Sequence, residues 1–162
     1  MLGYSNREEA TVKATPEAVF AVVSNLGDHA ALAGSGEVKA LRRVDDGTTL
    51  GVGATFEADE EIRMMGRTMK MTARSEIVEY EPPTVVSWTS MPSVPPKPKR
   101  IQWWFRLSLV DGGSTRVVHE CEVDFGAPNF LLRGPYALMR GGAVSRGMRQ
   151  TLANLQAHFA DS

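Results

Sequence analysis

Three side chains of this sequence are suited to transfer a proton inside an apolar cavity, and they are His119, Glu60 and Tyr136. An imidazole titrates near neutral pH, so His119 can serve as an acid, a base or a hydrogen-bond donor. Burial raises the pKa of a carboxyl group, so an inward Glu60 can also exchange a proton. Two plainer interpretations stay open: His119 as a core histidine bonded to a neighbour, and Glu60 as a charge near the rim of a sheet that reaches water.

The other reactive residue types form weaker patterns. Cys121 is the only cysteine and lacks the signature of an activated thiolate, so we expect it to pack as a small apolar side chain. Ser75 can donate a hydrogen bond to a ligand, although no nucleophile-elbow pattern surrounds it. His29, His119 and His158 have no paired-ligand spacing, and one cysteine cannot build a structural zinc site. We therefore expect no metal and no cofactor.

These residues must be positioned by strands, because the sequence between residues 38 and 124 alternates as a half-buried sheet does. From residue 56 to residue 64, for example, apolar side chains and Glu60 alternate with charged ones. The prolines of residues 92–98 predict an exposed connection between two strands. The predicted inward set is Phe56, Met64, Met69, Met71, Ser75, Trp88, Trp103, Phe105, His119 and Cys121. The predicted outward set includes Glu57, Lys70, Arg106 and Glu120.

Helices are predicted near both ends of the chain. Thr15 and Pro16 suit the N-cap and the first position of a helix, and a second short helical turn is predicted over residues 28–33. Apolar residues at helical spacing predict a long helix over residues 144–159. Before it, Gly134-Pro135 and Gly141-Gly142 interrupt the helical pattern.

The region before and within the closing helix supplies the last candidate ligand contacts, Tyr136, Met139 and Met148. The methionines of the chain suit an adaptable ligand surface, although methionine also fills ordinary cores. Four arginines in this region could clamp an anionic group of a ligand, but we prefer to interpret them as part of a solvated helix face. They are Arg133, Arg140, Arg146 and Arg149.

The order of these elements predicts an α+β fold. One helical region follows the first strand, consecutive hairpins build a curved antiparallel sheet, and a final helix lies across that sheet. Such an arrangement leaves space between the sheet and the helix for an apolar molecule. We expect a hydrophobic small molecule to bind there, in contact with the inward set and with Tyr136, Met139 and Met148.

Composition narrows the possible partners. The chain has 162 residues, which suits one domain over residues 1–162. Its 18 basic and 19 acidic residues give a net charge of −1, so we expect no nucleic-acid partner. No apolar run is long enough to cross a bilayer, and neither a signal peptide nor a disulfide is expected, which favours the cytoplasm. Trp104 is predicted to point outward, and an exposed tryptophan is compatible with a homodimer.

Five short motifs in this order resemble those of the START-like, or SRPBCC, superfamily, and within it the polyketide cyclase/dehydrase-type proteins. They are ATPEAVF at residues 14–20, GVGATF at residues 51–56, EYEPP at residues 79–83 with Trp88 after it, GGSTRV at residues 112–117, and residues 148–155 of the closing helix. The resemblance extends from about Ser5 to Phe159. It implies a helix-grip fold: a seven-stranded antiparallel sheet around the C-terminal helix, with two short helices after the first strand.

The resemblance leaves three functions open, because proteins of one fold serve many functions. The first is a carrier or sensor of a hydrophobic small molecule, lipid-like or polyketide-like. The second is a polyketide cyclase or dehydratase in which Glu60, His119 or Tyr136 transfers protons. The third is a protein-binding module of the chaperone-activator type. The scarcity of inward ionisable groups favours binding.

Overall fold

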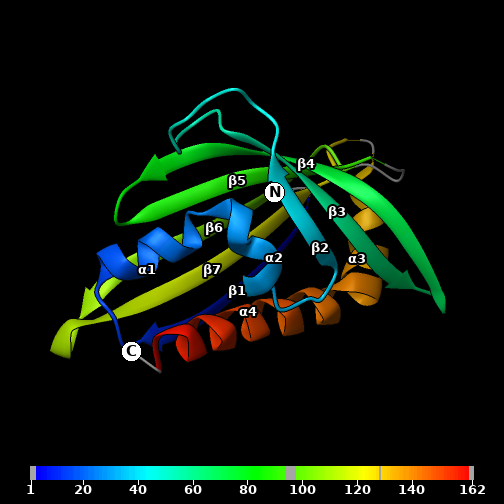
Figure 1. The fold of residues 1–162 in the computed structure, drawn as a ribbon. Helices are drawn as coiled ribbons and strands as arrows, with labels where there is room; N and C mark the ends of the chain where they lie inside the picture. The colour runs from blue at the N-terminus through cyan, green and yellow to red at the C-terminus, as the bar shows by residue number, and fades with distance from the viewer. Residues whose placement is uncertain (1–2, 94–97, 128, 161–162) are drawn as a thin grey trace.

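The structure is a computed structural model that describes residues 3–93, 98–127 and 129–160. Seven antiparallel strands form one curved sheet in the order β1-β7-β6-β5-β4-β3-β2 (Figure 1). The strands are β1 (Gly3–Val12), β2 (Val38–Arg43), β3 (Thr55–Met64), β4 (Arg67–Glu81), β5 (Val85–Pro92), β6 (Arg100–Val110) and β7 (Ser114–Asp124). The predicted α+β helix-grip fold is confirmed.

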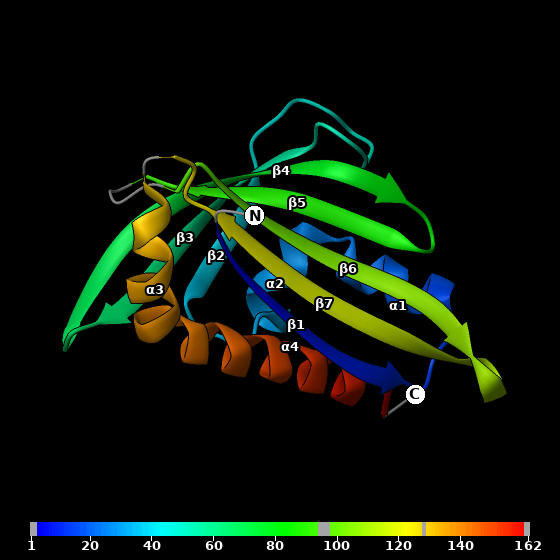
Figure 2. The same ribbon diagram turned by 180° about the vertical axis from the view of Figure 1, so that it is seen from behind.

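The helices cover the concave side of this sheet, as Figure 1 and the reverse view in Figure 2 show. The first group consists of α1 (Pro16–Val23), which packs near β5 to β7, and of η1 (Leu26–Asp28) and α2 (His29–Leu32), which pack near β2. The closing segment consists of η3 (Asn129–Leu132), α3 (Arg133–Tyr136), the π-helical turn η4 (Ala137–Gly141) and α4 (Gly142–Ala160). A short 3-10 turn, η2 (Asp111–Gly113), joins β6 to β7. No helix in the described ranges is long and apolar enough to cross a membrane.

Helix α1 begins where the sequence predicts. The Thr15 side chain accepts a hydrogen bond from the Ala18 backbone N–H at 3.4 Å, and Pro16 occupies the first turn. Val19, Phe20 and Val23 then fall on one side of the helix and are buried in the main core. This helix therefore closes one end of the concave face.

The alternation of the strands places the two predicted sets on opposite faces. Register pairs Phe105 with His119 on the inner face, while the neighbouring pair Arg106 and Val118 faces outward. On the outer face the Arg106 Nε lies 2.8 Å from a carboxylate oxygen of Glu120. Trp104 also lies there, half-buried, with the Arg106 guanidinium carbon 5.8 Å from its ring centre. The face predictions for these strands are confirmed.

The prediction of an exposed proline loop after Trp88 is wrong at its two ends. Pro92 is the last residue of β5 and is half-buried, and Pro98 is buried. Pro92 is paired with Ala73 of β4 at the end of β5. A proline is tolerated at the end of a strand, because the backbone N–H that it lacks is not needed there for the hydrogen bonds of the sheet. Pro95 and Pro96 lie outside the described residues.

The glycines before the closing helix permit close packing. A Cβ atom on Gly141 would lie 3.3 Å from the Tyr4 ring, and the Tyr4 hydroxyl donates a hydrogen bond to the Gly141 carbonyl at 3.3 Å. Gly34 has an even closer neighbour, because a Cβ atom there would lie 2.4 Å from the Thr151 backbone nitrogen. These contacts hold the helical segments against β1 and against the loop after α2.

Candidate functional site

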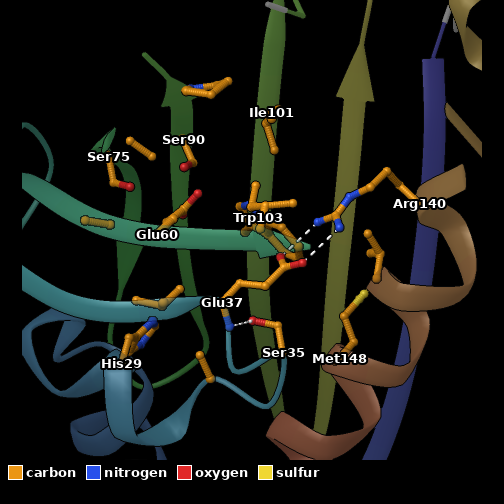
Figure 3. A pocket seen from close by; sticks show the side chains of 18 of the residues that line it. His29, Ser35, Glu37, Glu60, Ser75, Ser90, Ile101, Trp103, Arg140 and Met148 are labelled. Carbon is orange, nitrogen blue, oxygen red and sulfur yellow. Dashed lines mark hydrogen bonds and ion pairs between the residues drawn. The ribbon is translucent and has the colours of Figure 1, made fainter. Parts of the chain in front are cut away.

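A cavity of about 320 Å³ lies between the inner face of the sheet and the segment from α3 to α4 (Figure 3). Its lining is mainly apolar, as the sequence predicts. Most of the predicted ligand contacts line it, namely Met64, Met69, Met71, Ser75, Trp88, Trp103, Phe105, His119, Tyr136 and Met148. The proton-transfer candidate Glu60 lines it as well.

Three predicted contacts lie elsewhere in the described structure. Phe56 faces inward but is buried in the main core with residues of α1 and does not line the cavity. Cys121 packs among Val123, Phe125 and Met148, and burial raises the pKa of its thiol. Met139 is 50% exposed because it lies on the outer side of η4. Each therefore has a packing or surface environment instead of a place in the cavity wall.

Aromatic rings from three adjacent strands form one wall of the cavity. Trp88 on β5 is in register with Trp103 on β6, and Phe105 on β6 is in register with His119 on β7. The rings of Phe105 and His119 stack with centroids 4.2 Å apart and planes 12° apart. The Trp103 and His119 rings are stacked at 5.6 Å. This stack offers flat apolar surface to a ligand.

His119 is held in one tautomer. Its Nδ1 lies 2.9 Å from the Trp104 carbonyl oxygen, and because a carbonyl only accepts, the proton must be on Nδ1. Burial lowers the pKa of His119 to about 4. The imidazole is therefore neutral at pH 7, a weak base and a poor acid, with Nε2 as a hydrogen-bond acceptor.

A second histidine, His29 at the start of α2, also lines the cavity and was not predicted there. Its Nε2 donates to the Val23 carbonyl at 2.7 Å, and burial lowers the pKa of His29 to about 4. Its ring stands edge-on to Trp88 at 5.2 Å. The signal in the sequence is the three-residue spacing of Leu26, His29 and Leu32, all of which are buried.

An ion pair in the cavity lining joins the loop after α2 to η4. The two terminal guanidinium nitrogens of Arg140, Nη1 and Nη2, each lie 2.8 Å from a carboxylate oxygen of Glu37 (Figure 3). The preferred interpretation of Arg140 as part of a solvated helix face is thus wrong, because its side chain is only 16% exposed and lines the cavity. Arg149 instead pairs with Glu8 at 3.1 Å.

The other two ionisable candidates, Glu60 and Tyr136, have raised pKa values. Burial raises the pKa of Glu60, the Glu37 carboxylate raises it further, and Arg140 lowers it. Burial raises the pKa of Tyr136 to about 12, so this phenol stays protonated. Ser75 and Ser90 are in register on β4 and β5 and both line the cavity. These groups give the wall a few polar points in an otherwise apolar surface.

The three proton-transfer candidates all line the cavity but come from different elements. Within the described ranges, no hydrogen bond joins any two of His119, Glu60 and Tyr136. His119 is oriented by a backbone carbonyl and not by a carboxylate that would stabilise its charged form. The same described residues contain no group of three or more His, Cys, Asp or Glu side chains able to hold a metal ion.

Several solved structures share this fold at low sequence identity. The chain is similar to the major latex-like protein 151 of Panax ginseng, with 12% identity, 99% of each chain covered and a TM-score of 0.69. It is also similar to the Zhui aromatase/cyclase from Streptomyces sp. R1128, with 12% identity, 95% of this chain and 94% of that chain covered and a TM-score of 0.63. A START superfamily protein from Mycobacterium smegmatis matches with 11% identity, 98% and 99% coverage and a TM-score of 0.67.

At these identities the structural likeness shows the fold alone. No curated protein matches the chain in sequence. The family model described as "Polyketide cyclase / dehydrase and lipid transport", however, matches residues 5–160, nearly the whole chain. The protein therefore belongs to the polyketide cyclase / dehydrase and lipid transport family, within the START-like superfamily.

Proposed function

We propose that this protein binds an uncharged hydrophobic small molecule, as a carrier or sensor, in the cavity between the sheet and α4. The observation that carries the proposal is the mainly apolar cavity of about 320 Å³ whose two histidines are both neutral at pH 7. A cavity of this size is at the lower end of the range that encloses drug-sized ligands, roughly 300–1,000 Å³. Burial of apolar ligand surface supplies the driving force.

A titration with an uncharged fluorescent probe, N-phenyl-1-naphthylamine, tests this proposal. Ala143 on α4 lines the cavity, so Ala143→Phe is expected to fill it and to weaken probe binding at least tenfold. Ala153 lies on the exposed side of the same helix, so Ala153→Phe is the matched control and leaves affinity unchanged. Probe binding that is equally strong in all three proteins places the probe outside the cavity and refutes the proposal.

The second candidate is a polyketide cyclase or dehydratase, and one observation favours it. Glu60 carries a carboxyl group with a raised pKa into the same cavity as Tyr136, which is how a general acid is prepared. For a carrier, Glu60→Gln and His119→Phe leave affinity for an apolar probe within about tenfold. For an enzyme, the same changes lower turnover of a polyketide-like substrate by roughly 10²–10⁴. Product formation by the wild type that collapses in either variant overturns the carrier assignment.

Four further expectations belong with this proposal. A protein-binding module of the chaperone-activator type ranks below both candidates, because it gives no use to an open apolar cavity. A homodimer through the outer face, where Trp104 lies half-buried, stays a prediction. So do a cytoplasmic location and the absence of a nucleic-acid partner.

A further inference from the structure

Two buried histidines in the cavity wall each keep one ring nitrogen free. His119 uses Nδ1 and His29 uses Nε2 to bond backbone carbonyls, at 2.9 Å and 2.7 Å. No buried side-chain nitrogen or oxygen of the described residues lacks a hydrogen-bond partner. The second nitrogen of each ring, which has no such partner in the described part, must therefore retain accessible surface. His119 is 5% and His29 9% exposed and both line the cavity, so we infer that this small accessible surface faces the cavity.

The carbonyl bonds also decide what these two nitrogens can do. Each carbonyl requires the ring proton on the nitrogen that bonds it, so the free nitrogen, Nε2 of His119 or Nδ1 of His29, carries a lone pair. Both rings border the same aromatic surface. Phe105 stacks on His119 at 4.2 Å and stands edge-on to His29 at 6.1 Å. A flat molecule on this wall is thus flanked by two hydrogen-bond acceptors.

The charged groups of the lining argue against an anionic ligand. Arg140 is the arginine of the cavity wall, and its guanidinium is already engaged by both carboxylate oxygens of Glu37. Glu37 already neutralises the charge of Arg140, so a ligand carboxylate would gain little attraction there and would meet the lone pairs of the histidines. An ether or ester oxygen also brings only lone pairs to these nitrogens. A hydroxyl group brings the proton that they lack.

We propose that the cavity selects uncharged apolar molecules that carry hydroxyl groups, and that His119 Nε2 and His29 Nδ1 each accept a hydrogen bond from one hydroxyl. This inference rests on the proposed binding function and adds the chemical class of the ligand. It makes the two histidines specificity-determining residues.

Calorimetric titration with two matched ligand pairs tests the selectivity. The probes are 2,6- and 2,7-dihydroxynaphthalene, each compared with its dimethyl ether. The wild type is expected to prefer the better-fitting diol over its ether by roughly 30-fold, about fivefold for each hydrogen bond. His119→Phe and His29→Phe each lower that preference about fivefold, the double variant abolishes it, and affinity for the ether stays within a few-fold. His158→Phe, on the exposed end of α4, leaves the preference unchanged.

A spectroscopic measurement on the wild type covers the case in which a histidine variant fails to fold. Saturation with the diol is expected to shift the ¹⁵N resonances of His119 Nε2 and His29 Nδ1, whereas the ether leaves both near their ligand-free positions. If ether and diol bind equally and shift neither nitrogen, the histidine inference is overturned while the binding function stands. If neither compound binds, both proposals are overturned.

Discussion

The free energy of unfolding is expected to fall by about 4 kcal/mol as the pH is lowered from 6.5 to 4.5, about 2 kcal/mol for each buried histidine. Burial lowers the pKa of His29 and of His119 to about 4, against 6.5 for an ordinary histidine. Between these values the unfolded chain binds more protons than the folded protein, so stability rises with pH. The stabilisation is complete above pH 6.5 and is lost on acidification through this window.

Urea denaturation at a series of pH values measures this effect, and three substitutions isolate it. Burial raises the pKa of Glu60, so above pH 4.5 the folded state holds the extra proton and Glu60 contributes the opposite slope. Measurements in a Glu60→Gln background remove that contribution. Adding His119→Gln should then remove about half of the acid sensitivity, whereas His158→Gln should remove none. A free energy of unfolding that stays constant from pH 6.5 to 4.5 contradicts the burial of neutral histidines.

Phe105→Ala is expected to lower the free energy of unfolding by about 3–5 kcal/mol, a large share of the roughly 5–15 kcal/mol available to a protein domain. Phe105 is 1% exposed and joins the main core to the cavity wall. It stacks on His119 and packs against Trp88 with ring centroids 5.7 Å apart. Truncation of this side chain removes these contacts and enlarges the neighbouring cavity. The backbone of a central strand cannot move enough to fill the new space.

The control for this variant lies four residues further along the same strand. Leu109 is 66% exposed on β6, so Leu109→Ala should change the free energy of unfolding by no more than about 0.5 kcal/mol. Denaturant midpoints of both variants, compared at unchanged slope, give the two values. A loss below about 1 kcal/mol for Phe105→Ala would show that the aromatic wall is not part of the folded core.

The sheet was predictable because strand alternation is a local property. A period of two residues places Glu60 and Met64 on the same face of the sheet whatever the rest of the chain does. The same rule places His119 and Glu120 on different faces. The start of α1 was predictable for the same reason, since Thr15 caps it with its own side chain. Facing inward, however, is not the same as lining a cavity. Phe56 obeys the alternation, yet it is buried in the core with the residues of α1.

The polar part of the site depended on contacts that no local pattern encodes. Glu37 and Arg140 are separated by 103 positions in the chain, and only the packing of the loop after α2 against η4 brings them together. His29 lies in a four-residue helix, where the spacing to Leu26 and Leu32 indicates a buried side but not what the imidazole contacts. Its role follows from the Val23 carbonyl at 2.7 Å, a contact set by the tight turn between α1 and α2.

Native mass spectrometry of the protein purified from its own host tests the central claim, occupancy of the cavity by an apolar small molecule, most directly. The wild type is expected to carry an added non-covalent mass that denaturing conditions release, and Ala143→Phe, whose new ring occupies the cavity, is expected to lack it. The released compound should be uncharged and mainly apolar. The bare polypeptide mass in both proteins, or an equal added mass in both, would contradict the account.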